Sequence, residues 1–369
     1  MQPYSIYVHI PFCKARCSYC AFSSNTDMSL QKAYFDKLTE EIQNAYLPQR
    51  QIATVFFGGG TPSSVDEKYI SYLFEFLRKK FTFSPDCEIT CEVNPESATY
   101  DKMRLLRELG VNRVSFGLQS LNDGTLKKIG RLHNSEQFLQ AVDTAFKVGI
   151  DNVNADVIVG LPESEKEFLS TIQGVCALPL SHLSVYALEL YSDTPLWQLR
   201  DQCPTDQDYL ADLYDKAVSM LDAHGFKRYE TSNFAKEGRQ CKHNLNYWKE
   251  GRYYGFGAAA SGFVEDTRYT NLFDIRDYIA ADNVRQSQQT ESLDEQANEY
   301  VMLALRLAEG VDEAEFTQRY KKDFWQYFTN ADKLLKQGFL KRVDGRIVIP
   351  DDKVYVANSV LCELVSFDE

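Results

Sequence analysis

Residues 4–20 read Tyr-Ser-Ile-Tyr-Val-His-Ile-Pro-Phe-Cys-Lys-Ala-Arg-Cys-Ser-Tyr-Cys, a short apolar run that leads directly into three closely spaced cysteines. Cys13, Cys17 and Cys20 have the spacing Cys-x3-Cys-x2-Cys, and the other six of the nine cysteines are scattered along the chain. A structural zinc site usually takes four ligands, often as two Cys-x2-Cys pairs, and the sequence has no second pair. A thioredoxin-type site needs only two cysteines. The triplet therefore indicates another kind of metal centre.

Three thiolates on one loop can hold three corners of a [4Fe-4S] cluster, because thiolates are the usual ligands of iron–sulfur clusters. The fourth iron is then open to a small chelating molecule. S-adenosylmethionine (SAM) fits this position, since its amine and carboxylate can bind the iron and bring its sulfonium close to the cluster. An electron from the reduced cluster would then cleave a carbon–sulfur bond and release a 5′-deoxyadenosyl radical. We therefore predict that the three cysteines are metal ligands and that the cluster and SAM are cofactors.

The composition limits the class of protein. The chain has 369 residues, 44% of them hydrophobic, and a formal net charge of −13. That charge, without any run of five basic residues, argues against nucleic acid as a partner. No stretch of 18 apolar residues could span a membrane, and the N-terminal residues lack the pattern of a signal peptide. We therefore expect a cytoplasmic protein whose cysteines are free thiols or metal ligands.

The first half of the sequence alternates apolar strand patterns with amphipathic helical patterns. This alternation predicts a parallel sheet with right-handed crossovers, and six units are too few for the eight-fold barrel. We therefore expect an α/β fold built on a partial (β/α)6 barrel, with functional residues at the carboxyl ends of its strands. The predicted strands are 5–9, 53–57, 88–93, 113–118, 154–159 and 182–188, and the predicted helices between them are 30–46, 67–80, 100–109, 135–148 and 165–177.

From about residue 200 the pattern changes. A helical stretch at 206–224 precedes an irregular, aromatic and Gly-rich stretch at 229–263. Beyond it the sequence predicts three helices, at residues 294–308, 312–320 and 325–337. A hairpin at 338–349, turning at Asp344-Gly345, and a final apolar helix at 354–365 follow. This order suggests a small helical, winged-helix-like domain, although it lacks a basic recognition helix. We predict a core at 1–235, a connecting segment at 236–285 and a C-terminal domain at 286–369.

The motif Phe57-Gly-Gly-Gly-Thr-Pro62 follows the second predicted strand. Three glycines let the backbone come close to a ligand and present N–H and C=O groups to it. The structural alternative is a tight turn between a strand and a helix. Its place beside the cluster loop favours a role in binding.

Tyr7-Val-His-Ile-Pro-Phe-Cys with Cys-x3-Cys-x-Tyr-Cys resembles the radical SAM branch that contains oxygen-independent coproporphyrinogen III oxidase and related haem chaperones. The resemblance covers essentially the whole chain and implies a C-terminal domain of the HemN type. It implies that Tyr19 packs on the adenine of SAM, and that Gly59, Gly60 and Thr61 contact SAM near its methionyl amine. Further SAM contacts are implied at Tyr7, Glu92, Gln119, Arg131, Asp156 and Ala187. In the oxidase some of these positions serve a second SAM.

Chemistry supports these assignments without deciding them. A carboxylate accepts hydrogen bonds from ribose hydroxyls, and an arginine pairs with a carboxylate such as that of the methionyl group. Each side chain could equally be an ordinary solvated or ion-paired residue. The sequence alone leaves both interpretations open.

Two features separate the branches of this family. The oxidase has a further cysteine two residues after the third cluster cysteine, where this chain has Phe22. The segment Cys241-Lys-His-Asn-Leu-Asn-Tyr-Trp248 resembles the His-Asn-x-x-Tyr-Trp segment of the chaperones. We predict a loop there on which His243 binds the iron of haem b, with Cys241 as the alternative ligand. A lone histidine is otherwise more often a structural residue.

The resemblance therefore favours a haem chaperone that binds haem, the cluster and SAM and transfers haem to an acceptor protein, which could be membrane-associated. One alternative is the oxidase, in which a radical abstracts hydrogen from propionate side chains before decarboxylation. Another is a radical SAM methyltransferase. The sequence leaves open whether the chain is an enzyme, which acceptor it serves, and whether it is a monomer or a homodimer.

Overall fold

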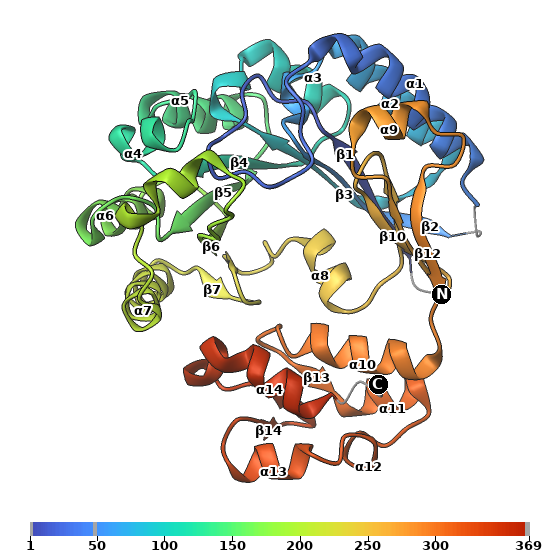
Figure 1. Ribbon diagram of the computed structural model, residues 1–369, viewed down its shortest axis with the longest axis vertical. Coiled ribbons are helices and arrows are strands. Elements are labelled where there is room, and N and C mark those ends of the chain that lie inside the picture. Colours follow the sequence, from blue (N-terminus) through green and yellow to red (C-terminus); the bar gives the residue numbers. More distant parts are fainter. Residues whose placement is uncertain (1–2, 47–49, 366–369) are drawn as a thin grey trace.

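The computed structural model describes residues 3–46 and 50–365, which form a large α/β domain and a smaller C-terminal domain (Figure 1). Six parallel strands lie side by side in chain order in the α/β domain: β1 (Tyr4–Ile10), β2 (Gln51–Gly59), β3 (Thr82–Val93), β4 (Arg113–Gln119), β5 (Asn152–Val159) and β6 (His182–Ala187). The helices that connect them are α1 (Gln31–Asn44), α2 (Glu67–Lys80), α3 (Tyr100–Glu108), α4 (Asp123–Lys128), α5 (Ser135–Lys147) and α6 (Glu165–Cys176). These units confirm the predicted partial (β/α)6 barrel.

Local sequence explains where several of these elements begin and end. The strands are largely buried, because the helices cover the outer face of the sheet and the inner face lines the barrel (Figure 1). Asn134 and Ser164 begin α5 and α6 with capping boxes, in which two residues three apart satisfy each other's polar groups. Gly110 and Gly149 follow α3 and α5 with φ of 99° and 85°, the left-handed geometry that commonly ends a helix.

The sheet extends beyond the six parallel strands at both edges, which the sequence did not predict. At one edge β9 (Tyr253–Phe256) pairs in parallel with β1, and the antiparallel strands β10 (Ser261–Val264), β11 (Thr267–Asn271) and β12 (Arg285–Thr290) follow. At the other edge, after α7 (Gln207–Ala223), β8 (Asn233–Ala235) pairs with β6 and with β7 (Lys227–Arg228).

The prediction of an irregular stretch at 229–263 is therefore wrong. Its glycines suggested loops, but at least one of them is required by close packing within the sheet. A Cβ on Gly255 would lie 1.7 Å from the Ser261 carbonyl oxygen. The same stretch contains the helix α8 (Lys242–Trp248), which lies between the barrel and the C-terminal domain (Figure 1).

The C-terminal domain has a hydrophobic core of its own, which includes Val301, Phe316 and Leu361. Its helices are α10 (Leu293–Ala304), α11 (Glu313–Tyr320), α12 (Phe324–Tyr327), α13 (Ala331–Lys336) and α14 (Ala357–Leu364). A three-stranded sheet accompanies them, in the order β13 (Val311–Asp312), β15 (Arg346–Val348) and β14 (Lys341–Val343). The hairpin turns at Asp344 and Gly345, both with positive φ, as predicted.

One helix of this domain was predicted incorrectly. Residues 325–337 form α12 and α13 rather than a single helix, and the chain leaves helical geometry at Phe328. Phe328 is buried there, and its ring packs against the rings of Phe316 and Phe324. Burial of this ring in the core compensates for the interrupted helix.

Glu250, which follows α8, ties the two domains together. Its buried carboxylate accepts hydrogen bonds from Arg319 and from the hydroxyl of Tyr320, both on α11. The predicted domain boundaries at residues 235 and 285 stay predictions. The strands of the predicted connecting segment share one sheet with those of the core.

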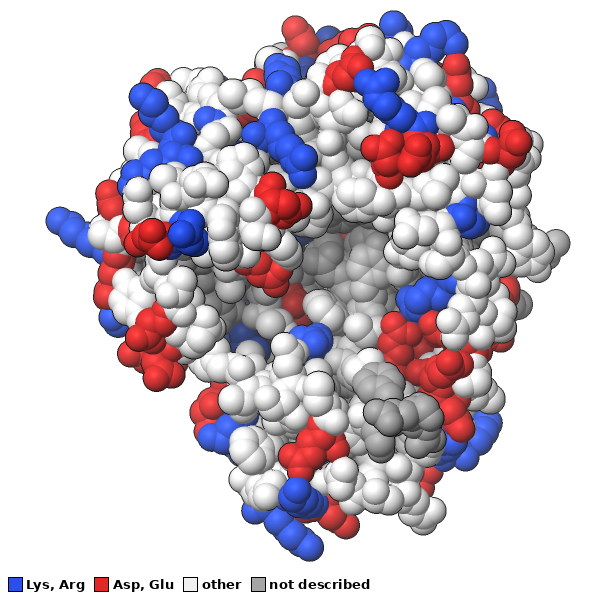
Figure 2. All heavy atoms as spheres, in the orientation of Figure 1, with Lys and Arg blue, Asp and Glu red and all other residues white. Residues whose placement is uncertain are grey.

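The surface agrees with the composition. Acidic and basic side chains are interspersed over the face seen in Figure 2, without a large area of basic residues. Among the helices of the described residues, none is both long enough and apolar enough to cross a membrane.

Candidate cluster and cofactor site

The cluster loop follows β1 at the carboxyl ends of the parallel strands, and backbone hydrogen bonds hold it there. The Cys13 N–H donates to the Asn25 carbonyl (3.0 Å), and the Ser18 N–H donates to the Ile129 carbonyl (3.0 Å). The side chains of the three cysteines remain partly exposed. The loop therefore presents its thiols from a fixed backbone.

Two polar side chains reach the sulfurs of this loop. Thr61 Oγ1 donates to Cys13 Sγ (3.5 Å), and Arg131 Nη1 donates to Cys17 Sγ (3.4 Å). Burial raises the pKa of Cys13 to about 11, although the hydrogen bond from Thr61 opposes the shift. Because thiolate ligands must be deprotonated, metal binding here would release protons. Donors aimed at the sulfurs suit a site that holds thiolates.

The three thiols are not gathered tightly around one ion position. Ligands about 2.3 Å from one tetrahedral ion lie about 4 Å from one another. Among the described residues, the one set of three metal-binding groups within 4.8 Å of one another is Glu250, Glu291 and Glu299, which contains no cysteine. The sulfurs of Cys13, Cys17 and Cys20 are therefore not all within 4.8 Å of one another.

The glycine motif packs tightly against β1 and the cluster loop. The N–H groups of Gly60 and Thr61 donate to carbonyls of residues 10 and 12 (2.9 and 2.8 Å), and that of Gly59 donates to Glu92 Oε2 (3.0 Å). Gly59 has a φ of 109°, and a Cβ on it would lie 2.4 Å from the ring of His9. The fold itself therefore requires this glycine. A ligand amine donates its hydrogen bonds, so it would use the oxygen atoms of this turn as acceptors.

Two acidic side chains, Glu92 and Asp156, lie in the barrel interior near its carboxyl end. Burial raises the pKa of Glu92 to about 8, and the charge of Asp156 contributes to the shift. Burial also raises the pKa of Asp156, although Ser115 and Asn154 donate hydrogen bonds to it. Tyr7 lies close enough to Glu92 for that carboxylate to add to the rise that burial causes in its pKa. Buried carboxyl groups of this kind would be stabilised as anions by a ligand that carries hydroxyls or positive charge.

Arg131 joins the cluster loop to the ends of β3 and β4. Its guanidinium is buried and donates to Asn94 Oδ1 (2.8 Å), to the Gly117 carbonyl and to Cys17. Gln119 at the end of β4 has a φ of 73°, which is costly for a residue with a side chain and often marks a functional position. Asn94 was missed in the sequence, and its signal was its place after a strand within Glu-Val-Asn-Pro.

Tyr19 and Ala187 complete the predicted SAM contacts. Tyr19 packs against a small apolar cluster on the same side of the barrel, formed by Leu126, Ile129, Ile158, Leu161 and Leu196. Ala187 ends β6 and is exposed. Of the predicted SAM contacts, Tyr19 lies within the cluster loop, and Thr61 and Arg131 contact its sulfurs. The assignment of these residues to SAM stays a prediction. Phe22, which stands where the resemblance places a further cysteine in the oxidase, is 69% exposed.

His243 lies elsewhere, on α8 toward the opposite end of the barrel. The predicted loop is wrong, because the segment is a short helix. Its imidazole is buried and stacks on Phe56, with ring centroids 5.1 Å apart. Nδ1 lies 2.6 Å from Thr54 Oγ1, and Nε2 lies 2.8 Å from the hydroxyl of Tyr247. Both ring nitrogens therefore have partners within the protein.

Cys241, the alternative haem ligand, has a different environment. It is fully buried, and its thiol donates to Glu88 (3.5 Å). Burial raises the pKa of this thiol to about 12, although nearby Arg113 opposes the shift. A neutral thiol bonded to a carboxylate is a poor ligand for iron.

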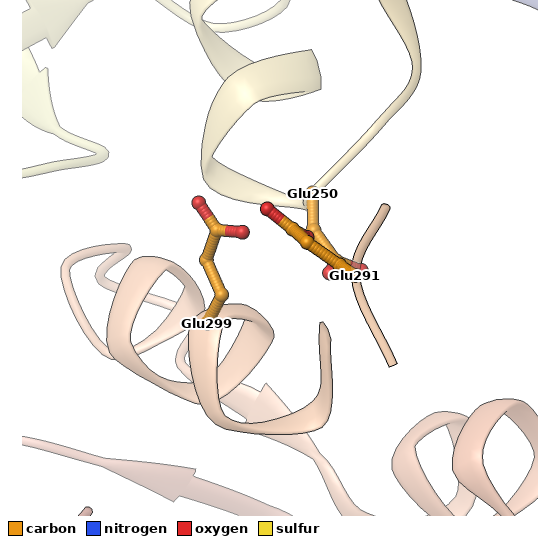
Figure 3. A group of neighbouring side chains, drawn as sticks. All are labelled: Glu250, Glu291 and Glu299. Carbon is orange, nitrogen blue, oxygen red and sulfur yellow. The ribbon is translucent and has the colours of Figure 1, made fainter. Parts of the chain in front are cut away.

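A cavity of about 330 Å³ lies where the α/β domain meets the C-terminal domain. Tyr7, Tyr247 and Tyr253 form part of its wall, together with Glu250 and Glu299. Figure 3 shows these two carboxylates pointing toward Glu291. Arg268 pairs with Glu291 and Glu299, while Arg319 pairs with Glu250, so the negative charge is compensated.

Comparisons with known proteins identify both domains. Residues 7–174 match the Radical SAM superfamily, and residues 292–352 match the HemN C-terminal domain. The solved structure of coproporphyrinogen III oxidase (HemN) from Escherichia coli is similar, with a TM-score of 0.87 over 98% of this chain and 90% of that chain. At 24% sequence identity, this similarity shows the fold alone.

Proteins that are more similar in sequence than this oxidase are named heme chaperone HemW. The heme chaperone HemW of Bacillus subtilis (strain 168) is 33% identical over 96% of this chain and 97% of its own length. That of Escherichia coli (strain K12) is 34% identical over 86% of each chain. Because these matches cover nearly complete chains, the protein belongs to the HemW family within the radical SAM superfamily.

Proposed function

We propose that this protein is a haem chaperone that carries a [4Fe-4S] cluster on Cys13, Cys17 and Cys20, binds SAM beside it, and holds haem through His243. The observation that carries the proposal is the presence of two separate sites. The first is a set of partly exposed thiols contacted by Arg131 and Thr61. The second is the buried imidazole of His243, whose Nε2 contacts Tyr247, and Tyr247 forms part of the wall of the cavity between the domains. Family membership supports the chaperone over the oxidase.

The residues around the cluster loop suit SAM. When bound, the cluster would supply an iron that SAM can chelate and electrons for its reduction. Arg131 would bind the methionyl carboxylate, and oxygens of Gly59, Gly60 and Thr61 would accept from the amine. Tyr19 would pack on the adenine. Tyr7, Glu92, Gln119, Asp156 and Ala187 would line the rest of the ligand. Among these, Glu92 and Asp156 would accept hydrogen bonds from ribose hydroxyls.

The environment of His243 suits a haem ligand. Burial lowers the pKa of this imidazole to about 3, and the charge of Arg113 adds to the shift. The ring is therefore neutral at physiological pH, and a neutral imidazole is the form that binds iron. Cys241 is the weaker candidate because its thiol stays protonated.

We infer further that haem passes to a haem-requiring acceptor, in the cytoplasm or at a membrane surface, and that the protein acts as a monomer or a homodimer. Haem transfer needs a reversible bond between iron and the chaperone. When the iron leaves, the imidazole of His243 can form its hydrogen bond with the hydroxyl of Tyr247 again, so iron binding is reversible. This supports delivery rather than permanent binding.

Hemin titration of the anaerobically reconstituted protein, followed by absorbance, tests the proposal. Wild type should bind hemin stoichiometrically, and His243→Ala should weaken binding at least about tenfold. His224→Ala is the matched control, because His224 is exposed and its Nδ1 contacts a backbone carbonyl. Absence of stoichiometric binding to wild type would contradict the chaperone. Conversion of coproporphyrinogen III with release of 5′-deoxyadenosine would establish the oxidase instead.

A further inference from the structure

A chain of hydrogen bonds fixes the tautomer of His243. The hydroxyl of Thr54 donates its single proton to Ser5 Oγ (2.8 Å). Thr54 Oγ1 must therefore accept the hydrogen bond that joins it to His243 Nδ1 (2.6 Å), and Nδ1 carries the ring proton. Nε2 of a neutral ring then has the lone pair, and the hydroxyl of Tyr247 donates to it (2.8 Å).

The rest of the environment holds this ring still. Its face stacks on Phe56, and the backbone N–H of His243 donates to Glu88 (3.1 Å). Histidines that bind metals usually donate their second ring N–H to a fixed acceptor, which orients the ring and raises its basicity. Thr54 has this role for His243. The imidazole thus has the orientation and protonation of a metal ligand, and Tyr247 occupies its coordinating nitrogen.

Tyr247 stands between this nitrogen and the cavity at the domain junction. It forms part of the cavity wall with the aromatic side chains of Tyr7, Tyr253 and Phe263. Its ring packs on the edge of Tyr253, with centroids 4.6 Å apart. A flat apolar ligand in this cavity would meet the hydroxyl of Tyr247 before it met Nε2 of His243.

We propose that Tyr247 is a displaceable plug that covers Nε2 of His243 in the haem-free protein. Haem iron binds Nε2 after the Tyr247 hydroxyl swings away, and the hydroxyl covers the nitrogen again when haem leaves. The hydroxyl keeps its proton, one hydrogen bond breaks, and one coordinate bond forms from the lone pair. This inference rests on the proposed haem function and adds to it how binding and release are controlled.

The test compares hemin binding by the full-length wild type and Tyr247→Phe. The variant keeps the ring and loses the hydroxyl, so Nε2 needs no exchange before it binds iron. Because a buried neutral hydrogen bond contributes modestly to stability, we expect Tyr247→Phe to bind hemin about fivefold more tightly, with an unchanged absorption spectrum. Tyr214→Phe is the matched control, since the Tyr214 hydroxyl donates to a backbone carbonyl on another part of the barrel.

Each outcome decides the proposal. Equal affinity of Tyr247→Phe and wild type would overturn it, and so would loss of binding or a changed spectrum, which would make Tyr247 itself an iron ligand. His243→Ala separates the two levels. If that variant binds hemin like wild type, the proposed haem site fails; if it loses hemin while Tyr247→Phe equals wild type, the plug alone fails.

A second variant tests the tautomer independently of Tyr247. Thr54→Val removes the acceptor of the Nδ1 proton while it keeps the shape of the side chain. We expect weaker hemin binding, by about fivefold, together with a shifted absorption spectrum because the imidazole becomes a poorer donor. Unchanged affinity and spectrum would contradict the role of Thr54 in presenting Nε2.

Discussion

The two ends of the barrel differ in how far the protein satisfies its own polar groups. At the carboxyl ends of the strands, Cys13, Cys17 and Cys20 are partly exposed, and donors point toward two of their sulfurs. Near the other end, Cys241 and His243 are fully buried and already bonded to protein groups. The open end, around Cys13, Cys17 and Cys20, is arranged for a ligand that the chain does not supply. At the closed end, around Cys241 and His243, the polar groups already have protein partners, so a ligand there must displace one of these partners.

Removal of a cluster ligand is the largest expected effect and tests whether the two ends are independent. Cys17→Ala should abolish the brown absorbance and the bound iron of the reconstituted protein, since two thiolates remain for a cluster that needs three from this loop. Hemin titration of the same variant should still show binding through His243. Iron analysis and absorbance measure the first effect.

The control for this experiment is Cys362→Ala, because Cys362 is exposed on α14 and far from the loop in sequence. It should keep its iron. If Cys17→Ala keeps its iron as well, the three cysteines are not the cluster ligands. If it loses hemin along with iron, the two ends of the barrel are coupled rather than independent.

Glu88→Ala should cause the second largest effect, at the closed end. Glu88 accepts hydrogen bonds from the backbone of Lys242 and His243 and from the thiol of Cys241, and it interacts with buried Arg113. Breaking a buried charged network costs about 3–5 kcal/mol, because the remaining charge is left uncompensated. Denaturant unfolding would measure this loss.

An exposed ion pair provides the reference for Glu88. Lys147 and Asp143 lie on the surface of α5, with most of each side chain exposed. Lys147→Ala should change the free energy of unfolding by less than about 0.5 kcal/mol. Glu88→Gln keeps an acceptor and should be less destabilising than Glu88→Ala. Equal effects of Glu88→Ala and Lys147→Ala would show that the closed end is not held by this network.

Local patterns predicted the open end well. The strand expected at 5–9 is β1 (Tyr4–Ile10), and the helix expected at 67–80 is α2. The cluster loop was predicted from the close spacing of Cys13, Cys17 and Cys20 in the sequence. The barrel follows from an alternation that repeats along the sequence. These features depend on neighbours in sequence, so a single sequence contains them.

The closed end depends on contacts between distant residues, which no local pattern shows. The side chain of Cys241 does not cap α8; the acceptor at this helix terminus is Glu88 on β3. Asn94, at the carboxyl ends of the strands, acquires its role in the same way, through bonds to Thr61 and Arg131, although its place after a strand was a local signal. His243 was identified by its motif, but its partners required the structure.

Glu92 gives a smaller, pH-dependent effect at the open end. Its folded pKa of about 8 lies above the unfolded value of about 4.3. Between these values the folded protein holds a proton that the unfolded chain releases, so stability falls as pH rises through this window. Glu92→Gln stays neutral and lacks this loss. It should be more stable than the wild type at pH 8, by up to a few kcal/mol, and the difference should vanish toward pH 4.

Thermal or denaturant unfolding of the cluster-free proteins between pH 4 and pH 8.5 measures this difference. Other buried acids titrate in both proteins, so the comparison isolates Glu92. A constant difference across this range would mean that Glu92 is ionised in the folded protein. In that case the Glu92 carboxylate would already be negatively charged before a ligand binds, rather than becoming charged when a positively charged ligand binds.

Phe22→Ala should have the smallest effect. Phe22 was predicted to distinguish the two branches of the family, but it is 69% exposed, so its ring makes little contribution to the folded core. Substitution should change the free energy of unfolding by less than about 0.5 kcal/mol and leave the iron content unchanged. A loss of iron without a loss of stability would instead give this ring a direct part in shielding the cluster. The open end would then depend on a side chain that packing alone does not explain.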